Sequence, residues 1–272
     1  MSEQFSVLMS VYKNTKTDEF IESFESLLSQ TVQASEYVVV KDGPISEELA
    51  SAISDLTSRA NIVVVPLETN VGLGLALRAG MEKCSFELVA RMDTDDIAVP
   101  TRFEKQLACF DAHPELSIVG GNIAEFEESI DNITSHRIVP ETHEEICEFM
   151  KSRCPFNHPT VMFKKSEVEK AGGYMDWHYN EDSYLWVRMY LAGCKFYNIQ
   201  EIFLYSRIDK DTFKRRGGKK YYKSERDLFK FMKDNKIITG GAYFKAKSIR
   251  FIVYVLMPNR MREWAFKKFA RS

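Results

Sequence analysis

The first 115 residues alternate between short apolar runs and segments with helical periodicity, and this alternation limits the possible folds more than any other feature. The strand-like runs cover residues 5–11, 37–40, 62–65 and 88–92. Apolar residues then recur at helical spacing over residues 20–28, 49–56, 73–81 and 103–110. Repeated βα units of this length predict an α/β protein, with a mostly parallel sheet, helices on both faces and right-handed crossovers.

The ends of several helices also have sequence signals. Thr17 or Asp18 is expected to cap the first helix, and Pro100 is expected to open the fourth. Further along, the strands predicted from the pattern are residues 117–122, 160–163 and 202–204, and the helices are residues 143–151, 166–171 and 181–192. Glycines after the last two of these helices are predicted C-caps, namely Gly172, Gly173 and Gly193. We expect one domain over residues 1–208 and a basic helical extension over residues 209–272.

Composition and charge narrow the class of protein. The formal net charge of −2 gives no argument for nucleic-acid binding, although residues 210–230 and 245–271 are strongly basic. The five cysteines lie far apart and form no C-x-x-C pair, which fits a reducing cytoplasm better than a disulfide framework or a zinc site. The first residues lack the pattern of a signal peptide, and no run approaches the length of an apolar membrane span. We therefore expect a cytoplasmic protein.

The acidic motif Asp93-Thr94-Asp95-Asp96 directly follows the strand predicted at residues 88–92. Proteins with α/β sheets build their active sites at the carboxyl ends of such strands. Crowded carboxylates repel one another unless a cation or protons neutralise them, and hard oxygen ligands suit Mg²⁺ or Mn²⁺ bound to a substrate's phosphates. We interpret the motif as a metal–diphosphate site, with a solvated acidic loop as the alternative.

Four elements occur in an order that resembles the inverting family-2 glycosyltransferases of the GT-A fold, over about residues 5–207. They are a strand ending in Ser10-Val11-Tyr12, a strand ending in Asp42-Gly43, the acidic motif, and a helix opening with Glu181-Asp182. The chain looks most like the bacterial enzymes that build O-antigen and exopolysaccharide repeat units, through residues 70–73 with Arg78 and through residues 215–218. The family usually has proline at the position of Ser10 and often asparagine at that of Lys13. The resemblance implies a Rossmann-like GT-A domain, with a nucleotide-binding half over about 1–115 and an acceptor half over about 116–208.

The resemblance implies that the donor is a UDP-sugar and gives several residues a role in binding it. Asp42 would accept hydrogen bonds from uracil, while Tyr12 and Arg78 would lie near the nucleotide. Asp93 would contact the ribose or a metal, and Asp95 would hold the Mn²⁺ or Mg²⁺ that bridges the diphosphate. A turn aspartate is the alternative for Asp42, and an exposed helix arginine is the alternative for Arg78.

Two arginines are expected to reach the donor from a segment that could fold over it. Arg207 ends a strand-like run, and Arg215 begins an Arg-Arg-Gly-Gly sequence. Arginine matches diphosphate oxygens bidentately, so a loop that orders on donor binding is physically reasonable. The alternative is a basic surface exposed to solvent.

The acceptor side of the reaction is assigned in the same way. The resemblance makes Asp182 the general base, which would deprotonate the acceptor hydroxyl as that oxygen attacks the anomeric carbon opposite the diphosphate. Inversion of an α-linked donor would give a β-linked product. Glu181, His158 and Trp177 are expected to contact the acceptor. The structural alternatives are helix capping for the two acids, a structural histidine, and a tryptophan packed in the core.

Apolar residues interleave with lysines and arginines from residue 244 to residue 269. Such an amphipathic basic stretch fits contact with the anionic inner face of the cytoplasmic membrane, which would suit an acceptor linked to a polyprenyl diphosphate. The alternative is a C-terminal helix packed on the domain with a lysine-rich outer face. Pro258 interrupts any single long helix.

The sequence thus predicts an inverting transferase that moves a hexose or N-acetylhexosamine, with galactose favoured, from a UDP-sugar to a lipid-linked saccharide during surface polysaccharide assembly. A sugar nucleotidyltransferase could use the same fold and acidic motif, but such enzymes usually carry an N-terminal glycine-rich loop, and residues 7–12 contain no glycine. A non-catalytic carbohydrate-binding relative is the third possibility, and the retention of Asp95 and Asp182 argues against it.

Overall fold

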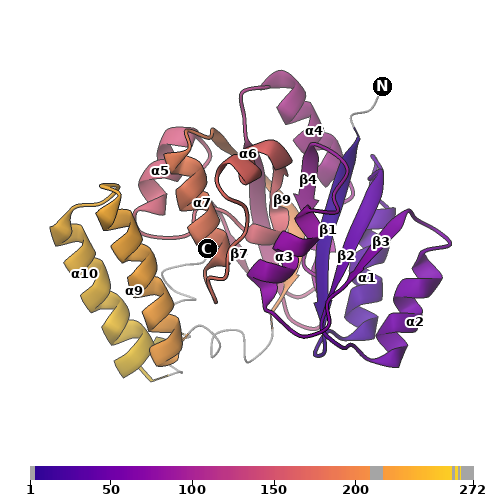
Figure 1. The fold of residues 1–272 in the computed structure, drawn as a ribbon, viewed down its shortest axis with the longest axis horizontal. Coiled ribbons are helices and arrows are strands. Elements are labelled where there is room, and N and C mark those ends of the chain that lie inside the picture. The colour runs from indigo at the N-terminus through magenta and orange to yellow at the C-terminus, as the bar shows by residue number, and fades with distance from the viewer. Residues whose placement is uncertain (1–3, 209–216, 259–260, 263, 265–272) are drawn as a thin grey trace.

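A computed structural model of the chain describes residues 4–208, 217–258, 261, 262 and 264. A single twisted sheet lies at the centre with helices on both of its faces, and a pair of C-terminal helices stands at one side (Figure 1). This arrangement confirms the predicted α/β class with a helical C-terminal extension.

The N-terminal half forms the parallel part of the sheet. Its strands are β1 (Phe5–Tyr12), β2 (Glu36–Asp42), β3 (Ile62–Pro66) and β4 (Leu88–Arg91). They lie in the order β3-β2-β1-β4, and every neighbouring pair is parallel. The helices of this half are α1 (Thr17–Leu28), α2 (Glu47–Leu56), α3 (Leu73–Met81) and α4 (Arg102–Ala112). The predicted βα units are confirmed.

The second half completes the sheet with mixed pairing. Its strands are β5 (Ile97–Ala98), β6 (Ile118–Phe126), β7 (Ile133–Arg137), β8 (Met162–Lys164) and β9 (Phe196–Arg207). β6 and β9 are parallel, whereas β8 runs antiparallel to both β4 and β6. β5 and β7 were not predicted, because β5 has only two residues and β7 is largely polar. β9 is much longer than the three residues predicted for it.

The helices of the second half lie close to the predicted ranges. They are α5 (His143–Met150), a short 3₁₀ turn (His158–Thr160), α6 (Lys165–Lys170) and α7 (Glu181–Leu191). The C-terminal part forms α9 (Gly218–Asp234), α10 (Gly240–Phe251) and a π-helical turn (Ile252–Leu256) that ends two residues before Pro258.

Two of the predicted helix starts are wrong by one or two residues. Lys16 occupies the N-cap of α1 and makes no side-chain capping bond, so Thr17 is already helical and neither it nor Asp18 caps the helix. α4 begins at Arg102 behind the N-cap Thr101, which leaves Pro100 just outside the helix.

The glycine C-caps are confirmed. Gly172, Gly173 and Gly193 have φ angles of 88°, 67° and 83°, which favour glycine over other residues. The amide of Gly173 donates to the carbonyl of Val168 at 2.8 Å, which is the bond that closes a Schellman motif after α6.

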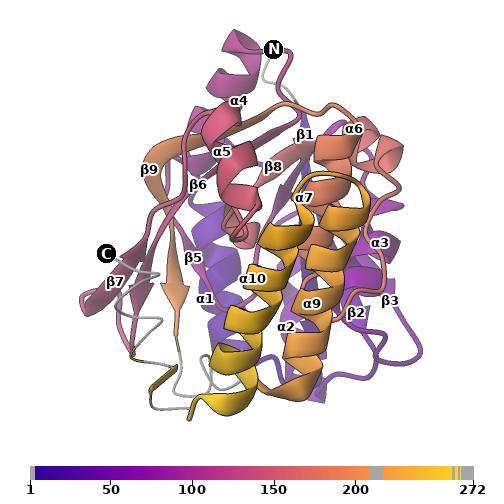
Figure 2. The same ribbon diagram turned by 90° about the vertical axis from the view of Figure 1, so that its left-hand side faces the viewer.

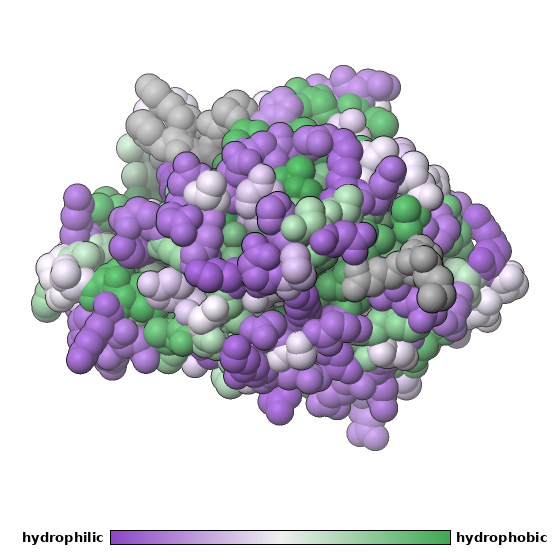
Figure 3. Space-filling model, turned by 90° about the horizontal axis from the view of Figure 1, so that it is seen from above, coloured by the Kyte–Doolittle hydropathy of each residue, from purple (hydrophilic) through white to green (hydrophobic). Residues whose placement is uncertain are grey.

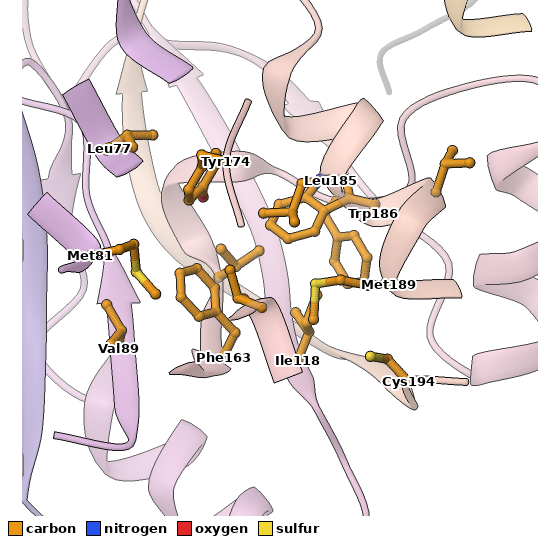
Figure 4. Packing of buried hydrophobic residues seen from close by; sticks show 14 of the residues in the cluster. Leu77, Met81, Val89, Ile118, Phe163, Tyr174, Leu185, Trp186, Met189 and Cys194 are labelled. Carbon is orange, nitrogen blue, oxygen red and sulfur yellow. The ribbon is translucent and has the colours of Figure 1, made fainter. Parts of the chain in front are cut away.

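Two hydrophobic clusters cover the two faces of the sheet. One lies beneath α1, α2 and α4, and the other beneath α3, α5, α6 and α7. Alternation along β1 serves both clusters, because Val7 and Met9 enter the first and Leu8 enters the second. Figure 4 shows the second cluster, in which Trp186 and Met189 of α7 lie near Phe163 of β8.

The two C-terminal helices differ in how they are packed. α9 places Leu228, Phe229 and Met232 in the second core cluster, so this part of the basic extension is joined to the domain. α10 lies beside α9, as both views show, and has no buried residue (Figures 1 and 2). Among the helices that the structure describes, none is both long and apolar enough to pass through a bilayer.

Candidate active site

A cleft of about 700 Å³ runs from the acidic motif at the end of β4 to the C-terminal helices. The start of α7, the end of α5 and parts of β6 and β7 form its other walls. The predicted site residues that line it are Asp93, Asp95, His158, Asp182 and Arg207. The structure therefore brings the acidic motif and the predicted base, 86 positions or more apart in the sequence, into one cavity.

The acidic motif is tied to three surrounding elements. Arg91, the last residue of β4, is 1% exposed, and its Nη1 lies 2.5 Å from Oδ1 of Asp93. The hydroxyl of Ser23 on α1 donates to the carbonyl of Asp93 at 3.0 Å. The backbone amide of Arg207 on β9 donates to Oδ1 of Asp96 at 3.1 Å. These bonds fix the loop so that its carboxylates remain close together.

This crowding disfavours the ionised carboxylates. Burial, and then the charge of Asp93, raise the pKa of Asp95 to about 6. Burial and the neighbouring carboxylates also raise the pKa of Asp96 well above its ordinary value. A divalent cation would relieve this repulsion, since it favours the ionised forms.

The donor set fits a cation that is shared with a substrate. No cluster of three or more His, Cys, Asp or Glu side chains suited to metal binding is found within the described ranges. Mg²⁺ and similar ions commonly use only one or two protein carboxylates and take their remaining ligands from water and substrate phosphates. Asp93 and Asp95 meet that requirement, because both line the open cleft.

Asp182 lies in the first turn of α7. Its Oδ1 accepts the amide of Ser183 at 2.6 Å, and Sγ of Cys154 lies 3.4 Å from its Oδ2. The neighbouring Glu181 does not line the cleft. Burial, and then the charge of Asp182, raise the pKa of Glu181 to about 7. Of the two acids, Asp182 is thus the one that faces the cavity.

The start of α7 is held by parts of the chain that are distant in sequence. Nδ2 of Asn180 donates to Oγ of Ser224 on α9 at 2.9 Å, and that hydroxyl donates to the carbonyl of His178 at 2.7 Å. On the other side, a Cβ on Gly74 of α3 would come within 2.5 Å of the carbonyl oxygen of Met175. A glycine is therefore needed at position 74 for α3 to approach this loop.

Asp42 closes the loop that precedes α3. Its Oδ1 accepts the amide of Val71 at 2.7 Å, while its Oδ2 accepts the amide of Gly72 at 3.1 Å and Nδ2 of Asn70 at 2.9 Å. These bonds use three of the roughly four lone-pair positions of a carboxylate. The carboxylate thus has a structural role in holding the loop, and its contact with uracil stays a prediction.

Two other predicted nucleotide residues lie outside the cleft lining. Tyr12 is 43% exposed at the end of β1, where it pairs in register with Asp42. Arg78 is exposed on α3. Their roles in donor binding stay predictions.

Arg207 lies in the cleft beside the acidic motif. Its Nη2 is 2.5 Å from Oε2 of Glu22, and its guanidinium stands 4.7 Å from the centre of the Phe126 ring. The side chain is therefore held by an acidic residue of α1 in the structure. Arg215, the second arginine expected to reach the donor, lies outside the described residues.

The remaining two acceptor candidates are packed against aromatic rings. Nε2 of His158 lies 2.8 Å from Oη of Tyr174, and burial together with the charge of Arg91 lowers the pKa of His158 well below its ordinary range. Trp177 stacks on Tyr184 with 4.0 Å between ring centres, and it does not line the cleft. Direct contact of either residue with the acceptor stays a prediction.

Sequence reasoning missed three residues that organise the site. Arg91 lies two positions before the acidic motif, and a buried cation in this position leaves no periodic signal. Asn180 and Ser224 meet across 44 positions of the chain, so nothing local in the sequence links them. Only Arg91, next to a motif already singled out, had a signal that could have revealed it.

Comparison with known proteins places the chain among sugar-transferring enzymes. The family model described as glycosyl transferase family 2 matches residues 6–170. The Erwinia amylovora protein named amylovoran biosynthesis glycosyltransferase AmsE is 37% identical over 267 residues, covering 97% of this chain and 98% of that protein. An Escherichia coli protein named UDP-Gal:alpha-D-GlcNAc-diphosphoundecaprenol beta-1,3-galactosyltransferase is 35% identical over 269 residues, covering 98% and 97%.

The fold has solved counterparts. The crystal structure of S. aureus TarS 1-349 in complex with UDP-GlcNAc aligns with a TM-score of 0.69 and 16% sequence identity, and the alignment covers 98% of this chain and 76% of that one. At this identity the likeness concerns the fold, which is the GT-A fold that the sequence predicts.

Proposed function

Because the chain belongs to glycosyl transferase family 2, we propose that it is an inverting enzyme that moves a sugar from a UDP-sugar to a lipid-linked saccharide during surface polysaccharide assembly. The observation that carries this proposal is the shared cleft of the acidic motif and Asp182. In an inverting transfer the acceptor hydroxyl attacks the anomeric carbon as the diphosphate leaves from the opposite side. The acidic motif would bind the diphosphate, and Asp182 would act as the base for the hydroxyl.

On the donor side, Asp93 and Asp95 would hold Mn²⁺ or Mg²⁺ together with the diphosphate. When bound, the ion supplies Lewis-acid stabilisation of the negative charge that develops on the leaving nucleoside diphosphate. Arg91 keeps Asp93 in place. Arg207 would bind the donor's diphosphate once the donor displaces its contact with Glu22. Asp42 holds the loop beneath the nucleotide.

On the acceptor side, Asp182 would take the proton from the attacking hydroxyl. The oxygen then forms its bond to the anomeric carbon as the bond to the diphosphate breaks, and the configuration inverts. An α-linked donor gives a β-linked product. Ser183 supports the carboxylate through its amide, and α9 fixes the helix start through Ser224.

The relatives suggest the substrates. The Escherichia coli protein is named for UDP-galactose and for a sugar on diphosphoundecaprenol, and the Erwinia amylovora protein for amylovoran biosynthesis. We propose galactose as the donor sugar and a saccharide on a polyprenyl diphosphate as the acceptor.

A donor screen tests this function. Purified protein with Mn²⁺ is incubated with UDP- and GDP-sugars and a lipid-diphosphate-linked sugar, and products are identified by mass spectrometry and anomeric NMR. We expect a β-linked product from a UDP-hexose. Nucleotide binding without transfer to any acceptor would favour a non-catalytic relative. Synthesis of a nucleotide sugar from a nucleoside triphosphate and a sugar phosphate would favour a nucleotidyltransferase.

Removal of the metal or of one carboxylate tests the donor site. We expect chelation, or Asp95→Asn, to lower kcat/KM by at least about 100-fold, because the ion contributes several kcal/mol of charge stabilisation. The exposed Asp55 on α2 provides a control, since Asp55→Asn removes the same charge away from the cleft. Full activity in the presence of chelator would show that transfer needs no divalent ion.

We also propose that α10 contacts an anionic membrane surface. Phe244, Lys245 and Lys247 lie on α10, and Ile252 and Leu256 lie on the π-helical turn that continues it. Phe244, Ile252 and Leu256 are more than half exposed. Seen from above, the end of the molecule where α9 and α10 lie shows hydrophobic residues among mostly hydrophilic ones (Figure 3), while the C-terminal end of α10 lies at the lower edge of Figure 1, on the face turned away from the viewer in Figure 3. Apolar side chains that enter the interface and cations that face anionic lipid would act together.

Vesicle sedimentation tests the membrane contact. Ile252→Gln with Leu256→Gln is expected to weaken binding to vesicles rich in anionic lipid by about tenfold or more, because two aliphatic side chains no longer leave water. Leu191→Gln, at a similarly exposed position on α7, is expected to bind like the wild type. Equal binding by all three proteins would exclude the π-helical turn after α10 as the contact surface.

A further inference from the structure

We propose that the part of the cleft walled by α9 and α10 binds the first segment of the acceptor's hydrocarbon chain. This proposal rests on the proposed transfer to a lipid-linked acceptor, and it adds a binding subsite for the lipid. Neither the family nor the names of the relatives assign residues to such a subsite.

The wall of this part of the cleft is apolar. Met150 of α5, Val187 of α7 and both Phe229 and Met232 of α9 line it, and each is buried in the structure. Ile249 and Val253 complete the lining from the opposite helix. The hydrocarbon that is still accessible to solvent in this wall belongs mainly to Ile249, which is 49% exposed, and to the half-buried Val253, and an isoprenoid chain would remove that surface from water.

The apolar wall continues to the outside of the molecule. Ile249 lines the cleft and is also 49% exposed, so it belongs to both surfaces. Ile252 and Leu256 follow it on the adjoining π-helical turn, where they are 52% and 62% exposed, so exposed apolar side chains continue beyond Ile249. A hydrocarbon chain that lies against Phe229 could therefore leave the cleft over Ile249, Ile252 and Leu256 towards a bilayer.

One short stretch of chain links the base to the helix that carries the apolar wall. Cys154 contacts Asp182, and the carbonyl of Ser152 accepts Nη2 of Arg250 at 2.7 Å. Cys154 and Ser152 are two positions apart, so the backbone between these two contacts spans at most about 7 Å.

Charge along this path suits the linking diphosphate. Arg153 and Arg250 line the cleft between Asp182 and the apolar wall, and Arg250 lies 3.7 Å from the centre of the Phe229 ring. Arginine pairs readily with phosphate oxygens. Arg250 also pairs with Glu225, which lines the cleft too, at 2.7 Å, so a diphosphate beside the hydrocarbon wall would take Arg250 from this carboxylate as it binds.

Acceptor analogues of different chain length test the subsite. The acceptor sugar found in the donor screen is prepared as the ethyl, hexyl and undecyl diphosphate ester and assayed below the critical micelle concentration. We expect KM to fall about tenfold or more from ethyl to undecyl, because each buried methylene strengthens binding several-fold. In the double variant Ile249→Gln with Val253→Gln, the ratio of KM for the ethyl ester to KM for the undecyl ester should fall to about two or less.

Leu191→Gln is the matched control, because Leu191 is exposed to a similar extent on α7 and does not line the cleft. Its ratio of KM values should equal that of the wild type. A ratio of KM values near one in the wild type would overturn the proposal. A ratio in the double variant equal to that of the wild type would overturn it as well.

A labelling experiment without any transfer separates this proposal from the proposed function. An undecyl diphosphate with a diazirine near the end of its chain is irradiated with the full-length protein, without donor or acceptor sugar. Labelling that is competed by plain undecyl diphosphate and maps to residues 149–150, 228–232 or 249–256 is expected. Competed labelling elsewhere, or none, would contradict the subsite even if sugar transfer is observed.

Discussion

Asp182→Asn is expected to lower kcat for sugar transfer by about 10³-fold, because asparagine cannot accept the proton of the acceptor hydroxyl and general-base catalysis contributes 10²–10⁴-fold. UDP binding should be unchanged, since the donor residues lie on other elements. The side chain is nearly isosteric, so its contacts with Cys154 and Ser183 can largely be kept. Single-turnover rates with saturating donor, together with calorimetric titration of UDP, measure both quantities.

Glu181→Gln is the matched control on the same helical turn. Glu181 does not line the cleft, so we expect less than a tenfold loss of kcat. The two acids are also coupled: the charge of Asp182 contributes to raising the pKa of Glu181 to about 7, so Asp182→Asn should lower the pKa of Glu181. A larger loss of transfer in Glu181→Gln than in Asp182→Asn would reverse the assignment of the base.

The sequence was sufficient for those parts of the fold that depend on local patterns. Apolar runs in β1 and β2 alternate between the two core clusters, and the helices between them show clear apolar stripes. The acidic motif follows β4 directly, so its place at a strand end could be read from the chain. Asp182 is predicted as the base only through a family resemblance, because acids at a helix start have a common structural role.

The sequence was insufficient where a contact joins distant parts of the chain. Arg207 pairs with Glu22 across 185 positions, and Asn180 meets Ser224 across 44 positions. β7 was missed because its polar residues carry little strand signal, and its place depends on pairing with β6. The wall that α9 and α10 give to the cleft was also missed, because it depends on a contact between distant parts of the chain. The sequence indicated a helical extension but did not show which face of α9 enters the core.

Arg91 illustrates how a residue that sequence reasoning passed over can govern the site. Its buried guanidinium faces several carboxylates, and its charge lowers the pKa of both Asp95 and Glu181. Arg91→Met removes that charge, so the pKa of Asp95 should rise above about 6 and that of Glu181 above about 7. At neutral pH more of these groups would then be protonated, and a protonated carboxyl is a poor ligand for a cation.

We therefore expect Arg91→Met to raise the Mn²⁺ concentration for half-maximal activity at pH 7 by about tenfold, because a rise of about two pKa units above a pKa of about 6 lowers the ionised fraction of Asp95 at this pH about tenfold. The deficit should shrink at pH 8.5, where the carboxyls ionise again. Manganese EPR without substrates gives the same comparison independently of turnover. Arg91→Lys keeps the charge and should recover part of the affinity.

Arg102→Met is the control for a buried arginine as such. Arg102 is fully buried, and it donates to the carbonyl of Arg91 and to Gln106 rather than to a carboxylate of the site. Its loss should lower thermal stability without the pH-dependent change in Mn²⁺ affinity. If both variants lose affinity equally at every pH, Arg91 acts through packing alone. If only Arg91→Met recovers at high pH, its charge keeps the acidic motif ready for the cation.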